Sequence, residues 1–172
     1  MKNFFLGVIT TVLVLFLAGW AYLRLGFAEV RGDLPPATWE TSLLTSAVHA
    51  SVRRQAPEVP NPVAPTDENL IDGGKAYLGD CAGCHGSLDK PDKYDTEHSL
   101  FPPIPQLPQV GTEYTEAQVF WVAKHGIRRS GMFANGKWTP DDKLWSMAAF
   151  IKRIRSLPPA VQSALAAKQP AH

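Results

Sequence analysis

The feature that most constrains this chain is a cysteine pair, Cys81 and Cys84, with His85 directly after it. The sequence contains no other cysteine. A structural zinc site needs about four nitrogen or sulfur ligands, and a thioredoxin-like redox pair does not need the histidine. Covalent haem attachment needs all three residues, because each cysteine bonds one haem vinyl group and the histidine ligates the iron. The CxxCH pattern therefore predicts one covalently bound haem c, with its iron.

A second constraint is the uncharged run at residues 4–23. As a helix, a run of this length spans about 30 Å, the thickness of the apolar core of a bilayer. Trp20 and Tyr22 lie near its end, where amphipathic rings favour the interface. The run predicts a transmembrane anchor within residues 1–30. The alternative is a cleaved signal peptide, since residues 26–28 (Gly-Phe-Ala) resemble a cleavage site, although signal peptides usually have shorter apolar regions.

Residues 31–66 are rich in proline at both ends and are predicted to form a connector. Between the prolines, residues 38–55 show apolar positions at helical spacing, which predicts a short helix. This face either covers the chain's own domain or meets the membrane or a partner helix. The Pro-rich end of the connector should be stiff and extended, and it should hold the following domain away from the bilayer. The apolar face consists of Trp39, Leu43, Leu44, Ala47 and Val48.

Three further helices are predicted after the connector, each preceded by a threonine that can cap its first turn. The last of them begins at Thr139-Pro140, with proline at the first helical position and acids after it. Residues 89–110 are interpreted as a Pro-rich loop, and residues 161–172 as a polar, Ala-rich tail. The predicted helices run over residues 66–80, 115–124 and 139–156.

Four short segments, in this order, resemble the class I c-type cytochromes, which are His/Met-ligated monohaem proteins. The resemblance covers roughly residues 67–158 and implies an all-α fold, with a small helical domain at residues 67–160 on a single membrane anchor. It also implies that the helix before CxxCH crosses the last helix, with small residues at the crossing. The segments are Gly73-Gly74-Lys75-Ala76-Tyr77, Cys81-Ala82-Gly83-Cys84-His85-Gly86, Pro105-Gln106-Leu107 and Gly131-Met132.

The resemblance further implies how the iron is held. His85 is expected as one axial ligand, and a proline carbonyl is expected to accept the other ring N–H of that histidine and fix its orientation. Pro105 is the candidate for this role, with Pro102 and Pro103 as close competitors.

Met132 is the expected sixth ligand, because a soft thioether in a loop can reach the iron from the side opposite the histidine. Met147 lies within the predicted last helix and is better explained by apolar packing. His98 and His125 are the alternatives; the first is expected to be solvated and the second to cap a helix. The family often has proline and tryptophan just after this methionine, and this chain departs from that pattern.

An iron with both axial positions filled exchanges electrons and does not transform a small-molecule substrate, so we expect an electron carrier and no enzyme. The resemblance implies that haem is attached outside the cytoplasm. It therefore predicts a single-pass protein of the cell inner membrane, with its haem domain in the periplasm. Its partners would be a redox donor and acceptor, such as a respiratory complex, an oxidase or a dehydrogenase. The alternatives are a haem subunit fixed in a larger complex and a gas or redox sensor, for which no output domain is recognised.

The charges are nearly balanced, with 17 Lys and Arg against 16 Asp and Glu, and this argues against nucleic acid as a partner. A local basic cluster lies around the predicted ligand loop; it is either ordinary solvated surface charge or a docking site for an acidic redox partner. It consists of Lys124, Arg128, Arg129 and Lys137.

Overall fold

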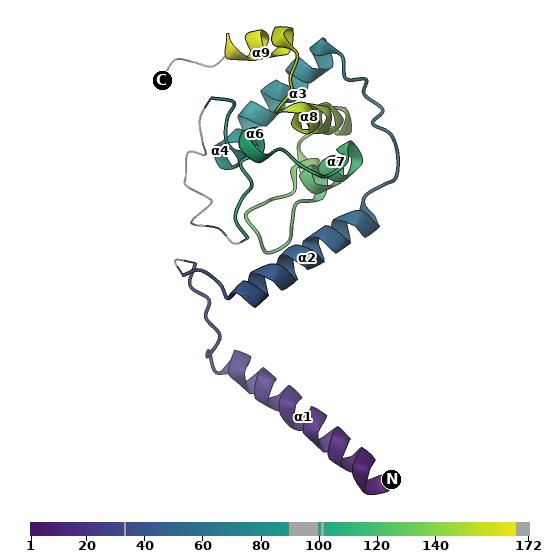
Figure 1. Cartoon of the computed structure of the whole chain (residues 1–172), viewed down its shortest axis with the longest axis vertical. Coiled ribbons are helices and arrows are strands. Elements are labelled where there is room, and N and C mark those ends of the chain that lie inside the picture. The colour runs from purple at the N-terminus through teal and green to yellow at the C-terminus, as the bar shows by residue number, and fades with distance from the viewer. Residues whose placement is uncertain (33, 90–99, 101, 168–172) are drawn as a thin grey trace. The chain divides into compact units, whose positions relative to one another are not determined.

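The computed structural model describes residues 1–32, 34–89, 100 and 102–167. Within these residues every regular element is helical, which confirms the predicted all-α fold (Figure 1). The elements are α1 (Lys2–Arg24), α2 (Thr38–Gln55), α3 (Asp67–Asp80), α4 (Ala82–His85), α6 (Leu107–Val110), α7 (Glu116–His125), the 3-10 helix η1 (Asn135–Lys137), α8 (Asp141–Arg153) and α9 (Pro159–Ala166).

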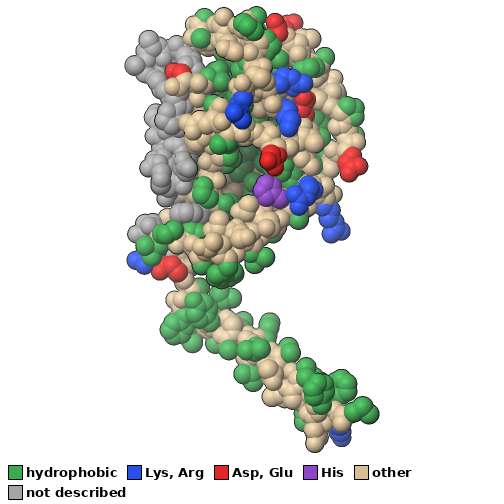
Figure 2. All heavy atoms as spheres, viewed as in Figure 1, with side chains coloured by type: hydrophobic (Ala, Val, Ile, Leu, Met, Phe, Trp, Pro, Cys, Tyr) green, Lys and Arg blue, Asp and Glu red, His purple; other side chains and the backbone are tan. Residues whose placement is uncertain are grey.

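The first of two compact units, Met1–Leu34, consists mainly of α1. None of the residues of α1 is buried, and Figure 2 shows hydrophobic side chains along its whole length. It has 23 residues, an 18-residue stretch within it has a mean hydropathy of 2.3, and among the described residues it is the one helix long and apolar enough to cross a membrane. A membrane anchor and a signal sequence share these properties.

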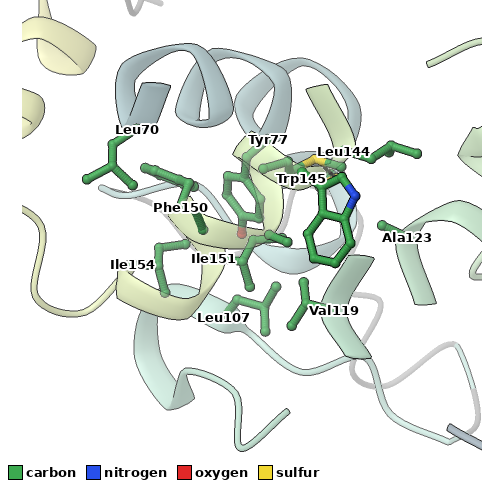
Figure 3. Close-up of a cluster of buried hydrophobic side chains, with 14 of the residues drawn as sticks. Leu70, Tyr77, Leu107, Val119, Ala123, Leu144, Trp145, Phe150, Ile151 and Ile154 are labelled. Carbon is green, nitrogen blue, oxygen red and sulfur yellow. Dashed lines mark hydrogen bonds between the residues drawn. The ribbon is translucent and has the colours of Figure 1, made fainter. Parts of the chain in front are cut away.

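The core of the second unit, Pro35–His172, is built around the crossing of α3 and α8. A Cβ atom at Gly73 would collide with the backbone carbonyl of Ser146, so the two backbones touch there. The rings of Tyr77 and Phe150 pack beside this point, with centroids 5.5 Å apart (Figure 3). The crossing implied by the resemblance is therefore present, and glycine is what permits it.

Helix α7 packs on the other side of α8. The rings of Phe120 and Trp145 stack with centroids 4.0 Å apart and nearly parallel planes. A capping box closes the start of α7: the Thr115 hydroxyl accepts the Gln118 N–H, and the Gln118 side chain accepts the Thr115 N–H. This start agrees with the predicted cap.

The start of α8 differs from the prediction. Helix α8 begins at Asp141, Pro140 occupies the cap position with extended backbone, and no side chain hydrogen-bonds to the first turn. Thr139, the predicted cap, lies one residue too early to reach the free N–H groups. The negative charges of Asp141 and Asp142 in the first turn still stabilise the N-terminus of α8.

Two short helices lie where the sequence predicted irregular chain. Residues 161–172 were expected to be a tail, but α9 occupies most of the described part of that segment, and Val161 and Leu165 are fully buried. A Cβ at Gly74 would lie 2.6 Å from a Leu165 methyl group, so α9 packs closely against α3 at this glycine. Val161 and Leu165 lie four residues apart, but the alanines around them made no apolar pattern recognisable in the sequence.

Within the predicted loop at residues 89–110, α6 forms a single helical turn; residues 90–99 and 101 lie outside the described residues.

Helix α2 was predicted as part of a connector, and the structure places it in the same unit as the rest of the domain. Val52 and Ala56 are buried, and the Tyr114 hydroxyl lies 2.7 Å from His49 Nδ1. Beyond α2, the Asn61 amide donates to Glu116 and to the Trp145 carbonyl. Asn61 thus fastens the end of the Pro-rich segment to the domain.

Candidate haem site

The CxxCH segment forms a tight helical turn directly after α3. Cys81 ends α3 and begins α4, and Gly86 then leaves the turn with a φ of +82°, a conformation that favours glycine. From α3, the Tyr77 hydroxyl donates to the Gly86 carbonyl at 2.6 Å and lies 3.1 Å from that of His85. The turn is therefore held in place by a buried side chain of the core.

The His85 ring has a defined orientation. Its Nδ1 lies 2.9 Å from the Pro105 carbonyl oxygen, so Nδ1 carries the proton and Nε2 presents a lone pair. Burial lowers the pKa of His85, and the hydrogen bond to Pro105 opposes this effect. A neutral imidazole with this tautomer is the form that ligates a metal. Next to Pro105, the largely buried Gln106 side chain donates to the Cys84 carbonyl at 3.1 Å and ties the two segments together.

The two cysteines do not form a disulfide. Cys81 is buried with its sulfur 3.5 Å from that of Met147, and Cys84 is half-buried. As a thiol, Cys81 has its pKa raised to about 12, first by burial and then by the nearby charges of Asp80 and Cys84. Such a protonated thiol is a poor metal ligand.

The donor set fits haem and does not fit zinc. Among the described residues, no three His, Cys, Asp or Glu side chains are grouped so that they could hold a metal ion, and this includes Cys81, Cys84 and His85. A zinc ion would require them to converge. Haem c requires the two sulfurs at the ring edge and the imidazole at the iron, so their side chains diverge.

Met132 lies half-buried in a tightly bonded loop. Its carbonyl accepts the Ile127 N–H at 2.8 Å, and its own N–H donates to the Ser130 hydroxyl at 3.1 Å. The loop leaves α7 at Gly126, whose φ is +66° and where a Cβ would lie 2.6 Å from the Met132 carbonyl oxygen. The methionine backbone therefore has one well-defined position.

Asn135 connects this loop to α7. Its side chain is 3% exposed and donates to the Ala123 carbonyl at 3.1 Å. No hydrogen-bonding role could be predicted from the sequence for Asn135, Gln106 or Tyr77. Their polar groups act through backbone carbonyls, which leave no spacing pattern in the sequence.

The rival ligands differ in their surroundings. Met147 is 1% exposed in the core of α8, with its sulfur 3.5 Å from that of Cys81. His125 is exposed at the end of α7, with its ring centroid 5.1 Å from that of Trp121. His98 lies outside the described residues.

Comparison with known families gives an independent line of evidence. Residues 68–151 match the model of a family described as cytochrome c oxidase, cbb3-type, subunit III. No curated protein and no solved structure matches the chain. The matched segment runs from α3 through nearly all of α8 and contains the CxxCH turn. Residues 68–151 therefore form a monohaem c-type cytochrome domain, and its covalently bound cofactor is haem c with its iron.

Proposed function

We propose that this cytochrome carries single electrons between redox partners at the periplasmic face of the cell inner membrane, to which α1 anchors it. The observation that carries the proposal is the ordered CxxCH turn, in which the Pro105 carbonyl fixes the His85 tautomer. A positioned imidazole and a soft thioether suit an iron that changes its oxidation state without opening a coordination site.

The residues divide the task as follows. Cys81 and Cys84 would hold the haem through thioether bonds, and His85 Nε2 and the Met132 sulfur would ligate its iron. Pro105 keeps the imidazole oriented, and the hydrogen-bonded loop around Met132 limits the reorganisation needed when the charge changes. The bound haem supplies a one-electron iron couple.

A second candidate function is that of a haem subunit fixed in a larger respiratory or dehydrogenase complex. The matched family favours it, because its description names an oxidase subunit. In that case the electrons pass to a catalytic partner chain and the cytochrome does not leave it.

Purification from the native membrane tests both candidates. The denatured polypeptide should retain haem stain after electrophoresis, and a redox titration should follow a one-electron couple. Loss of haem in acid acetone would contradict covalent attachment. Extraction in mild detergent then separates the two functions: a shuttle purifies alone, whereas a fixed subunit purifies with its catalytic partner in constant proportion.

A further inference from the structure

Helix α2 turns its large apolar side chains away from the domain on which it packs. Trp39 is 69% exposed and Leu43 is 61% exposed. The opposite face carries Thr41 and Thr45, which are half-buried and share their side of the helix with the buried Val52. In a helix surrounded only by water and its own domain, we would expect the reverse arrangement.

The exposed side chains form one patch. Trp39 and Leu43 are one turn apart, the exposed Ala47 and Ala50 continue their row, and Leu44 lies beside it, 50% exposed. We call these five residues the α2 stripe. Its own five side chains are uncharged, while Glu40, three residues before Leu43 and four before Leu44, and Arg54, one turn after Ala50, lie beside them on the same face. Within the described part of the second unit, no other helix of comparable length exposes a row of this kind: the other exposed large apolar residues are Val59, Val110, Phe133 and Trp138.

We propose that the α2 stripe inserts into the interfacial layer of the bilayer that α1 crosses, so that α2 lies on the membrane surface. The inference rests on the proposed anchoring by α1. The 13 residues between α1 and α2 span at most about 45 Å even when fully extended, so the bilayer is always within reach.

The composition of the stripe also favours lipid over protein. Tryptophan and leucine on one face of a surface helix are typical of interfacial anchoring, with the indole ring at the headgroup level. The stripe is a convex row on a single helix, not a groove. Because the other face of α2 is fastened to the domain through Val52 and the His49–Tyr114 contact, insertion would hold the haem domain against the membrane in one orientation.

Depth measurement by spin labelling tests the proposal in the full-length, haem-loaded protein. Cys81 and Cys84 are thioethers there, so an introduced cysteine is the thiol that reacts. Labels would be placed by Leu43→Cys in the stripe, Leu13→Cys in α1 as the bilayer reference, and Lys75→Cys at an exposed position of α3 as the water reference. The protein is reconstituted in phosphatidylethanolamine–phosphatidylglycerol vesicles without any other protein.

We expect the label at position 43 to be more accessible to oxygen than to a water-soluble nickel chelate, with a ratio between those of the two references. A ratio equal to that at position 75 would overturn the proposal. If position 43 becomes shielded only in native membranes that contain other proteins, a protein partner covers the stripe and lipid does not. A water-like ratio at position 13 would instead show that the anchor itself is wrong, which is a separate failure.

Discussion

The assignment of the sixth ligand rests on a single residue, and substitution can test it. Met132→Ala should leave the haem attached through both cysteines, because the thioether bonds do not involve this side chain. It should remove the soft axial donor and open the iron to carbon monoxide, which can be followed by absorption spectroscopy. The weak ferric band near 695 nm that the family resemblance implies should disappear.

Met147→Ala is the matched control for this ligand assignment. Met147 is buried in α8, so its truncation should cost about 2–5 kcal/mol of stability through cavity formation while the iron keeps both ligands. If Met147→Ala opens the iron and Met132→Ala does not, the assignment of the sixth ligand is reversed.

At the scale of the helices, the crossing of α3 and α8 makes a quantitative prediction. Gly73→Ala would push a methyl group into the Ser146 carbonyl, a backbone atom that cannot rotate away, and should destabilise the domain by about 1–3 kcal/mol or more. Gly79→Ala is the control in the same helix: nothing lies within 4 Å of its Cβ position, and the change should stabilise by up to about 1 kcal/mol. Urea midpoints of the two variants should move in opposite directions.

The helices also show how far the sequence could lead. The ranges of α2, α3 and α7 could be predicted because a periodic apolar pattern or a threonine cap marks each of them. Pattern alone could not tell which side of α2 faces the domain, because Val52 competes with the larger Trp39 and Leu43 and tertiary packing decides between them. Helix α9 was missed because two apolar side chains in a short segment carry too little periodicity.

In the candidate site, too, the sequence predicts what a local pattern marks and does not predict contacts between distant segments. CxxCH names the residues that bond to haem, since chemistry fixes their spacing. Pro105 could be proposed from its place in the order of segments, but only its distance to His85 distinguishes it from the neighbouring prolines. Gln106 and Asn135 hold backbone carbonyls from distant segments, and nothing in their local sequence points to those carbonyls.

For the whole molecule, anchoring by α1 predicts how the protein behaves on extraction. The native protein should stay in the membrane through high salt and carbonate and should need detergent for release, because the side chains of α1 are exposed and apolar. Its N-terminal sequence should begin at or near Met1. A soluble protein that begins at Glu29 would identify α1 as a cleaved signal sequence.

Docking is a second property of the whole molecule. Arg128, Arg129 and Lys137 are exposed and have no ion-pair partner among the described residues, whereas Lys124 pairs with Asp141 at 2.7 Å. Electron transfer to an acidic partner should slow as salt rises, since the Debye length falls from about 30 Å at 0.01 M to about 10 Å at 0.1 M. Reversing both arginines to glutamate should slow transfer and leave the haem spectrum unchanged. A rate that ignores both salt and charge reversal would show that these cations are only solvated surface.

The crossing of α3 and α8 also sets an order of events during synthesis. The CxxCH turn follows α3 directly, but α8, whose Met147 lies beside Cys81, is complete only 69 residues after Cys84. At about 5–20 residues per second, this interval lasts roughly 3–14 s. Until it ends, α8 is incomplete, and its contacts with Gly73 and with Cys81 are not fully in place. Because α8 is synthesised after the CxxCH turn, there is a period in which Cys81 and Cys84 of a growing chain remain accessible.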